Sequence, residues 1–183
     1  MSSVRKKSAQ PPSTGFQHRN LPLLLLQARE GVLARFRPIL GEHGLTEQQW
    51  RIIRALLEAQ GPLEPRQIGQ LCRISSPSLA GVLARMHELG LVQRERVALD
   101  QRRVMISLSP ISVQLAARMA PHIEAMYLHL ETHIGAETVA RFYASLDEMI
   151  KLLGDLPDPE PEQTCRPTPV SAATKKRASS SRS

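Results

Sequence analysis

The chain has 183 residues, 42% of them hydrophobic, and its formal net charge is +7. That size suits one domain with a core and tails, and the absence of any run of 18 apolar residues argues against a membrane span. Two cysteines, Cys72 and Cys165, are too few for a disulfide framework, so we expect a cytoplasmic protein.

Charge is unevenly distributed along the chain. Residues 1–19 carry four basic side chains and no acidic one, and residues 155–183 carry five basic and four acidic ones, which leaves +2 for residues 20–154. Both ends are rich in Ser, Pro and Thr and are predicted to be disordered tails. Within the middle, residues 73–103 hold six arginines against three acidic residues. This basic stretch suggests a polyanionic partner.

The first two predicted elements are helices, over 21–42 and about 47–59. An apolar stripe in the first comprises Leu25, Val32, Leu33, Phe36 and Leu40. Gly44 separates the helices and Thr46 caps the second, which is expected to bury Trp50, Ile53 and Leu57.

The stretch "LEPRQIGQLCRISSPSLAGVLARMHELG" predicts two short helices joined by a tight turn. Pro65 opens the first, with Ile68 and Leu71 facing inward. Ser76 is the expected N-cap of the second, Pro77 its first residue and Gly90 its end. The expected buried stripe of that second helix comprises Leu79, Val82, Leu83, Met86 and Leu89. Two helices with this spacing form a helix-turn-helix.

A β-hairpin is predicted directly after this pair. "GLVQRER" is a strand signal, "VALDQ" a turn, and "RVMISL" a return strand with alternating apolar residues. A hairpin attached to a helix-turn-helix is a winged helix. Arg102 and Arg103 lie near its tip, and Asp100 is placed to orient the Arg102 guanidinium.

Two long helices are predicted to complete the chain. The first, about 110–134, is capped by Ser109, opened by Pro110 and expected to kink at Pro121; the second covers about 136–153. Together with the first helix they present more apolar surface than a small monomer covers. The expected architecture is therefore mainly α with a small β-hairpin: a winged helix-turn-helix lobe plus a helical dimerisation region.

The same sequence also bears on several other functions. The sequence has no glycine-rich phosphate loop after a strand, no H-E-x-x-H pair and no nucleophile elbow, so we expect neither an enzyme nor a cofactor. Non-specific nucleic-acid binding through the tails remains an alternative. A redox switch at Cys72 and a metal sensor at His129 and His133 are further alternatives, but Cys72 is expected to be buried and the histidine pair lacks a third ligand.

Over roughly residues 21–153 the chain resembles the MarR-type winged-helix regulators. The motifs that carry the resemblance are "SSPSLAGVLARMHELGLVQRE" and the wing "DQRRVMISLS". "LPLLLLQARE" and "FRPILGEHGLTEQQWR" are similar to the branch that represses operons for aromatic-acid breakdown, homoprotocatechuate and nicotinate among them. The chain departs from the family at Val97-Ala98, where an Asp-Pro pair is common, and at Ser112, where glycine is common.

The resemblance implies a MarR-type domain over 20–154, with dimerisation helices in 20–60 and 110–154 and a DNA-binding lobe over 61–109. It implies a homodimer on a pseudo-palindromic double-stranded operator, with one helix of each copy in the major groove. The residues expected to contact DNA are Arg73, Ser76, Pro77, Ser78, Gly81, Arg85, Arg102 and Arg103.

The resemblance also implies an effector, a small aromatic carboxylic acid bound between the dimerisation helices and the DNA-binding lobe. A buried carboxylate calls for an arginine. The candidate ligand-binding residues are Arg29, His43, Trp50, Arg54 and Arg94.

Overall fold

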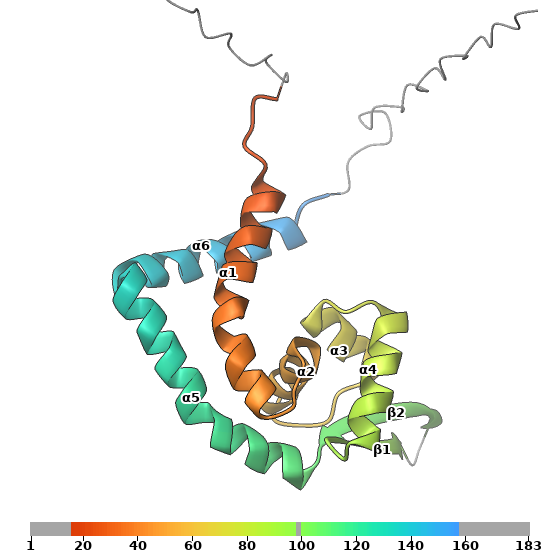
Figure 1. Ribbon diagram of the computed structural model, residues 1–183. Coiled ribbons are helices and arrows are strands. Elements are labelled where there is room, and N and C mark those ends of the chain that lie inside the picture. Colours follow the sequence, from red (N-terminus) through yellow and green to blue (C-terminus); the bar gives the residue numbers. More distant parts are fainter. Residues whose placement is uncertain (1–15, 98–99, 158–183) are drawn as a thin grey trace, which may run out of the picture. The chain divides into compact units, whose positions relative to one another are not determined.

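The computed structural model describes residues 16–97 and 100–157, so most of both predicted tails lies outside the described part of the chain. The described residues form α1 (Leu21–Glu42), α2 (Glu47–Glu58), α3 (Pro65–Cys72), α4 (Ser76–Glu88), β1 (Val92–Val97), β2 (Asp100–Leu108), α5 (Pro110–Ile134) and α6 (Ala136–Gly154). The expected mainly helical fold with one antiparallel hairpin is confirmed (Figure 1). The described residues up to Ile134 form one compact unit, and Gly135 begins a second.

Local capping explains where α1 and α2 begin. The Asn20 side chain accepts a hydrogen bond from the Leu23 backbone at 3.1 Å. Thr46 and Gln49 form a reciprocal capping box, with bonds of 3.2 and 2.9 Å, at the start of α2. Between the helices, Gly44 adopts a positive φ of 67° that favours glycine. The buried face of α2 was only partly predicted. Ile53 is buried as expected, but Ile52 and Leu56 join it in the core, while Trp50 and Leu57 are half-buried.

The helix-turn-helix differs from its prediction in three details. The N-cap of α4 is Ser75, one residue earlier than expected, and Ser76 is its first residue. Leu71 was expected to face inward but is 62% exposed, because Ile68 and Cys72 take the buried face of the short α3. Leu89 is 44% exposed, because it caps α4 and Gly90 then turns the chain away with a φ of 67°.

The hairpin is fastened to the rest of the lobe. β1 pairs with β2 from Val92 opposite Leu108 to Arg96 opposite Val104, with an irregularity before Val97. Leu63, just before α3, pairs with Ile106 through two backbone hydrogen bonds of 2.9 and 2.8 Å. Ile106 is 1% exposed, so the expected alternation on this strand anchors the wing in the core.

Helix α5 is tied to this lobe at its first turn. The Ser109 hydroxyl caps it by accepting from the Ser112 backbone at 3.2 Å, as predicted for this position. The buried Ser112 hydroxyl in turn donates to the Leu91 carbonyl at 2.6 Å, which gives this departure from the family pattern a structural role. Further along, α5 runs through Pro121, and Tyr127 packs against Phe36 of α1 in a tilted arrangement, with ring centroids 4.9 Å apart and planes at 54°.

Helix α6 has an apolar face that its own unit does not bury. Within the described residues none of its side chains is buried, and Phe142, Tyr143, Ile150, Leu152 and Leu153 are all about half exposed or more. Among the described helices, none combines the length and apolar character that a membrane crossing requires.

Candidate nucleic-acid interface and effector site

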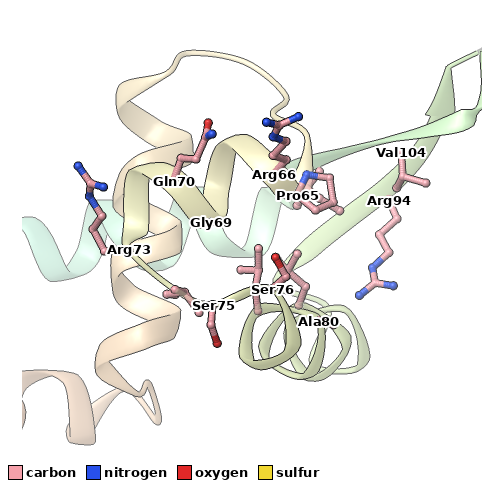
Figure 2. Close-up of a pocket in the computed structure, with 14 residues that line it drawn as sticks. Pro65, Arg66, Gly69, Gln70, Arg73, Ser75, Ser76, Ala80, Arg94 and Val104 are labelled. Atoms are coloured by element: carbon pink, nitrogen blue, oxygen red, sulfur yellow. The ribbon is translucent and has the colours of Figure 1, made fainter. Parts of the chain in front are cut away.

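A groove of about 960 Å³ lies between α3, α4 and the hairpin. Its floor is apolar and includes Leu79 and Leu83 of α4 and Val104 and Ile106 of β2. Three arginines line it: Arg66 on α3, Arg73 in the turn and Arg94 on β1. In Figure 2, Arg94 extends from the hairpin toward α4, while Arg66 and Gln70 project from α3.

The groove is positively charged and has no acidic residue among its lining residues. Arg66, Arg73 and Arg94 are exposed, and within the described residues none of them forms an ion pair. Three uncompensated guanidinium groups around one groove favour an anionic partner such as a phosphate backbone.

The exposed side of α4 contains the residues expected to read DNA. Ser76, Pro77, Ser78, Gly81 and Arg85 are all exposed. The Ser75 hydroxyl donates a hydrogen bond to the Ser78 hydroxyl at 3.0 Å, and Arg85 pairs with Glu88 at 3.1 Å. A Cβ placed on Gly81 would meet nothing within 4 Å. A DNA groove can therefore approach the first two turns of α4 closely.

The turn before α4 is held by α2. Arg73 adopts a left-handed conformation with φ 50°, which is costly for a residue other than glycine. Arg51 donates to the Cys72 carbonyl at 2.7 Å, and the Cys72 thiol donates to the Arg51 carbonyl at 3.6 Å. Burial raises the pKa of the Cys72 thiol, so it stays protonated at neutral pH. Cys72 is therefore a structural residue, as expected.

The wing arginines have different surroundings, and one prediction about them is wrong. The Asp100 carboxylate accepts the backbone N–H of Arg102 at 3.1 Å instead of binding its guanidinium, because a carboxylate two residues upstream closes a local turn. Arg103 pairs with Glu64, its Nε donating at 2.7 Å and its Nη2 also contacting the same oxygen. The residues at the hairpin tip, 98 and 99, lie outside the described part of the chain.

The proposed effector residues fall into two places. Arg29 meets Glu47 at 3.5 Å and Arg54 meets Glu58 at 3.0 Å, while Trp50 and His43 are half-buried. Arg94 is instead a groove residue, and none of the other four candidates lines that groove.

A charge network surrounds Arg29. Glu47 is also bound by Arg37 at 2.5 Å, and Arg37 contacts Glu30 as well. The two carboxylates raise the pKa of Arg37, and the Arg37 hydrogen bond lowers the pKa of Glu30. Arg29 therefore shares its acidic partner with a second arginine.

Sequence reasoning missed four residues of this region. Arg66 and Gln70 line the groove, Glu64 holds Arg103, and Arg51 holds the turn. Their signal in the sequence is weak, since each acts on a partner from another element. The histidine pair on α5 does lie together, with His129 and His133 rings 4.1 Å apart. Within the described residues, however, no group of three or more metal-ligand side chains exists.

A helix-turn-helix with a β-hairpin wing and a basic groove defines a winged-helix DNA-binding protein. The MarR family model matches residues 43–103. The chain is 40% identical to the homoprotocatechuate degradative operon repressor of Escherichia coli over 135 residues, covering 74% of this chain and 90% of that protein. The chain belongs to the MarR family and is a transcriptional regulator, not an enzyme.

Two solved structures are similar throughout this region. The transcriptional regulator PA4135 is 41% identical, with a TM-score of 0.70, and the match covers 73% of this chain and 98% of that one. NadR in complex with 4-hydroxyphenylacetate is 35% identical, with a TM-score of 0.66, covering 75% and 96%. Both the expected family and its fold are thus confirmed.

Proposed function

We propose that the protein acts in the cytoplasm as a homodimeric repressor that binds a pseudo-palindromic operator and is released by a small aromatic carboxylic acid. The observation that carries the DNA-binding part is the groove lined by arginines and by no acidic residue, together with the exposed start of α4, where Ser76 and Ser78 lie. Similarity to a repressor of homoprotocatechuate degradation and to a structure that contains 4-hydroxyphenylacetate supports the class of effector.

The DNA contacts we propose involve the major groove, the phosphates and the minor groove. Ser76, Ser78 and Arg85 on the exposed side of α4 enter the major groove, where Gly81 permits close approach. The remaining proposed contacts are Pro77 at the start of α4, Arg73 and Arg94 with the phosphates, and Arg102 and Arg103 with the minor groove.

Dimerisation would place two copies of α4 in successive major grooves, with half-sites about 10 bp apart. The exposed apolar face of α6 supports this proposal, because a monomer gains nothing from leaving such a face in water. Exposed apolar side chains also occur on α1 (Leu23, Leu26) and on α5 (Leu128, Ile134).

The effector site we propose centres on Trp50 and Arg54. They lie four residues apart on α2 and hence on one face, so a ring stacked on Trp50 brings its carboxylate near Arg54. The Arg54 partner is the exposed Glu58, and an exposed pair of this spacing is worth only about 0.3–0.5 kcal/mol, so a ligand displaces it at little cost. Arg29 and His43 complete the proposed wall, while Arg94 is assigned to the DNA side.

Fluorescence anisotropy on the duplex upstream of the protein's own gene tests the proposal. At fixed salt we expect tight binding to that duplex and weak binding to a scrambled one. We expect release by one of 4-hydroxyphenylacetate, homoprotocatechuate, nicotinate and 6-hydroxynicotinate. Equal binding to both duplexes would favour the non-specific alternative.

Effector binding can be followed separately. Trp50 is the only tryptophan, so the releasing acid should change its emission. Arg54→Gln should raise the Kd of the acid about 10-fold or more, because it removes a charged hydrogen bond worth about 1.5–3 kcal/mol. Arg29→Gln tests the second arginine of the proposed wall, and a larger loss of affinity in that variant would place the carboxylate at Arg29.

A further inference from the structure

The contact between Arg103 and Glu64 joins two residues 39 positions apart, one on the wing and one at the start of α3. Both Nε and Nη2 of the guanidinium contact Oε1 of the carboxylate. The Arg103 side chain is still 55% exposed, whereas Glu64 is only 31% exposed. The pair thus leaves much of the arginine open to a further partner.

The backbone at both ends of this pair is fixed. Leu63, next to Glu64, is bonded in both directions to Ile106, three residues beyond Arg103. Glu64 is also the N-cap of α3, and its backbone N–H donates to the Gln67 side chain at 2.8 Å. Arg85, by contrast, pairs with an exposed glutamate on its own helix. Arg103 is thus held by a residue of a second element, whose backbone is bonded to the strand that carries Arg103.

A guanidinium has five N–H donors in one plane. Glu64 engages the edge formed by Nε and Nη2, which leaves the Nη1 donors for a second acceptor. A carboxylate that fixes one edge of an arginine therefore also fixes the direction of the other edge. From the sequence, Asp100 is expected to orient the Arg102 guanidinium in this way. Its carboxylate accepts the backbone N–H of Arg102 instead.

We propose that Glu64 is a positioning residue for operator recognition, which presents Arg103 to the DNA and fixes the wing against α3. This inference rests on the proposed contact between Arg103 and DNA. It predicts the direction in which DNA affinity changes when Glu64 is removed. If Glu64 acted only through its charge, its removal would strengthen DNA binding, because a carboxylate near phosphates is repelled. A positioning role predicts that removal weakens operator binding.

Glu64→Ser tests the direction of this change. Serine is a preferred N-cap residue, so Glu64→Ser keeps the start of α3 while it removes the partner of Arg103. We expect operator Kd at fixed salt to rise about 2- to 10-fold, the cost of ordering a free arginine on binding, with Tm unchanged. Binding to scrambled DNA should stay equal or become tighter. Glu95→Gln on β1, an exposed carboxylate on the same lobe, should not weaken operator binding.

A double-mutant cycle separates this role from general damage. In the Arg103→Ala background, Glu64→Ser should cause no further loss. Tighter operator binding by Glu64→Ser, no change, or an equal loss in the Arg103→Ala background would each overturn the positioning role. A wild-type protein that does not distinguish the operator from scrambled DNA would overturn the proposed function, and this role with it.

Discussion

At the residue scale, the two wing arginines are neighbours with different constraints. Arg103 is held by Glu64, whereas the Arg102 guanidinium has no ion pair within the described residues. We predict that Arg102→Ala weakens operator binding by about 1–3 kcal/mol, because an unpaired guanidinium at the wing suits a narrow, electronegative minor groove. Anisotropy titrations measure this loss. Arg35→Ala on α1, an exposed arginine far from the wing in the sequence, is the control and should bind normally.

Cys72 gives a second prediction at this scale. Its raised pKa keeps it a thiol, so hydrogen peroxide should leave operator binding unchanged in a Cys165→Ser background. Because the unfolded thiol ionises near pH 8.5 and the folded one ionises higher, the Cys72 contribution to stability is complete below pH 8.5 and is lost as pH rises above it. The difference in Tm between the wild type and Cys72→Ala should therefore become smaller as the pH is raised from 7 to 10. Peroxide-induced release would instead identify Cys72 as a sensor.

At the element scale, helix boundaries could be predicted from the sequence where capping and turn residues determine them locally. Thr46, Pro65 and Gly90 act within one turn of themselves, so their roles could be predicted without the rest of the fold. The adjacent Ser75 and Ser76 are equally good caps, and only the backbone distinguishes them. The exposure of Leu71 could not be predicted, because α3 is too short for periodicity to decide which side packs.

The α4 helix offers a prediction in which stability and function move in opposite directions. Gly81 is exposed in a helix interior with free space around it, so Gly81→Ala should raise the free energy of unfolding by about 0.5–1 kcal/mol. The added methyl group faces the proposed major groove, so operator affinity should fall. Thermal melts and anisotropy measure the two effects. Gly41→Ala on α1 should stabilise the protein without affecting DNA binding, and unchanged operator affinity in Gly81→Ala would move the DNA away from this face.

At the scale of the whole molecule, the site depends on residues that the sequence keeps apart. The groove is assembled from α3, α4 and both strands, so Arg73 and Arg94 line one cavity although they are 21 positions apart in the sequence. Composition alone indicated a basic region over 73–103. It did not indicate that Arg66 belongs to the same surface, or that Glu64 neutralises part of it. The pairing of Leu63 with Ile106 brings the start of α3 next to β2, where Glu64 meets Arg103.

In the second unit, the apolar face of α6 is exposed within the described residues and is available to a second copy of the chain. If a second copy covers this face, Ile150→Asp should convert the dimer to a monomer in sedimentation experiments, since a buried, unpaired carboxylate is strongly unfavourable. Operator binding should then fall, because one copy engages one half-site. Ala144→Asp adds the same charge on the opposite, polar face of α6, beside Glu148 and Lys151, and should remain dimeric. A dimer that survives Ile150→Asp would place the interface on α1 and α5 instead.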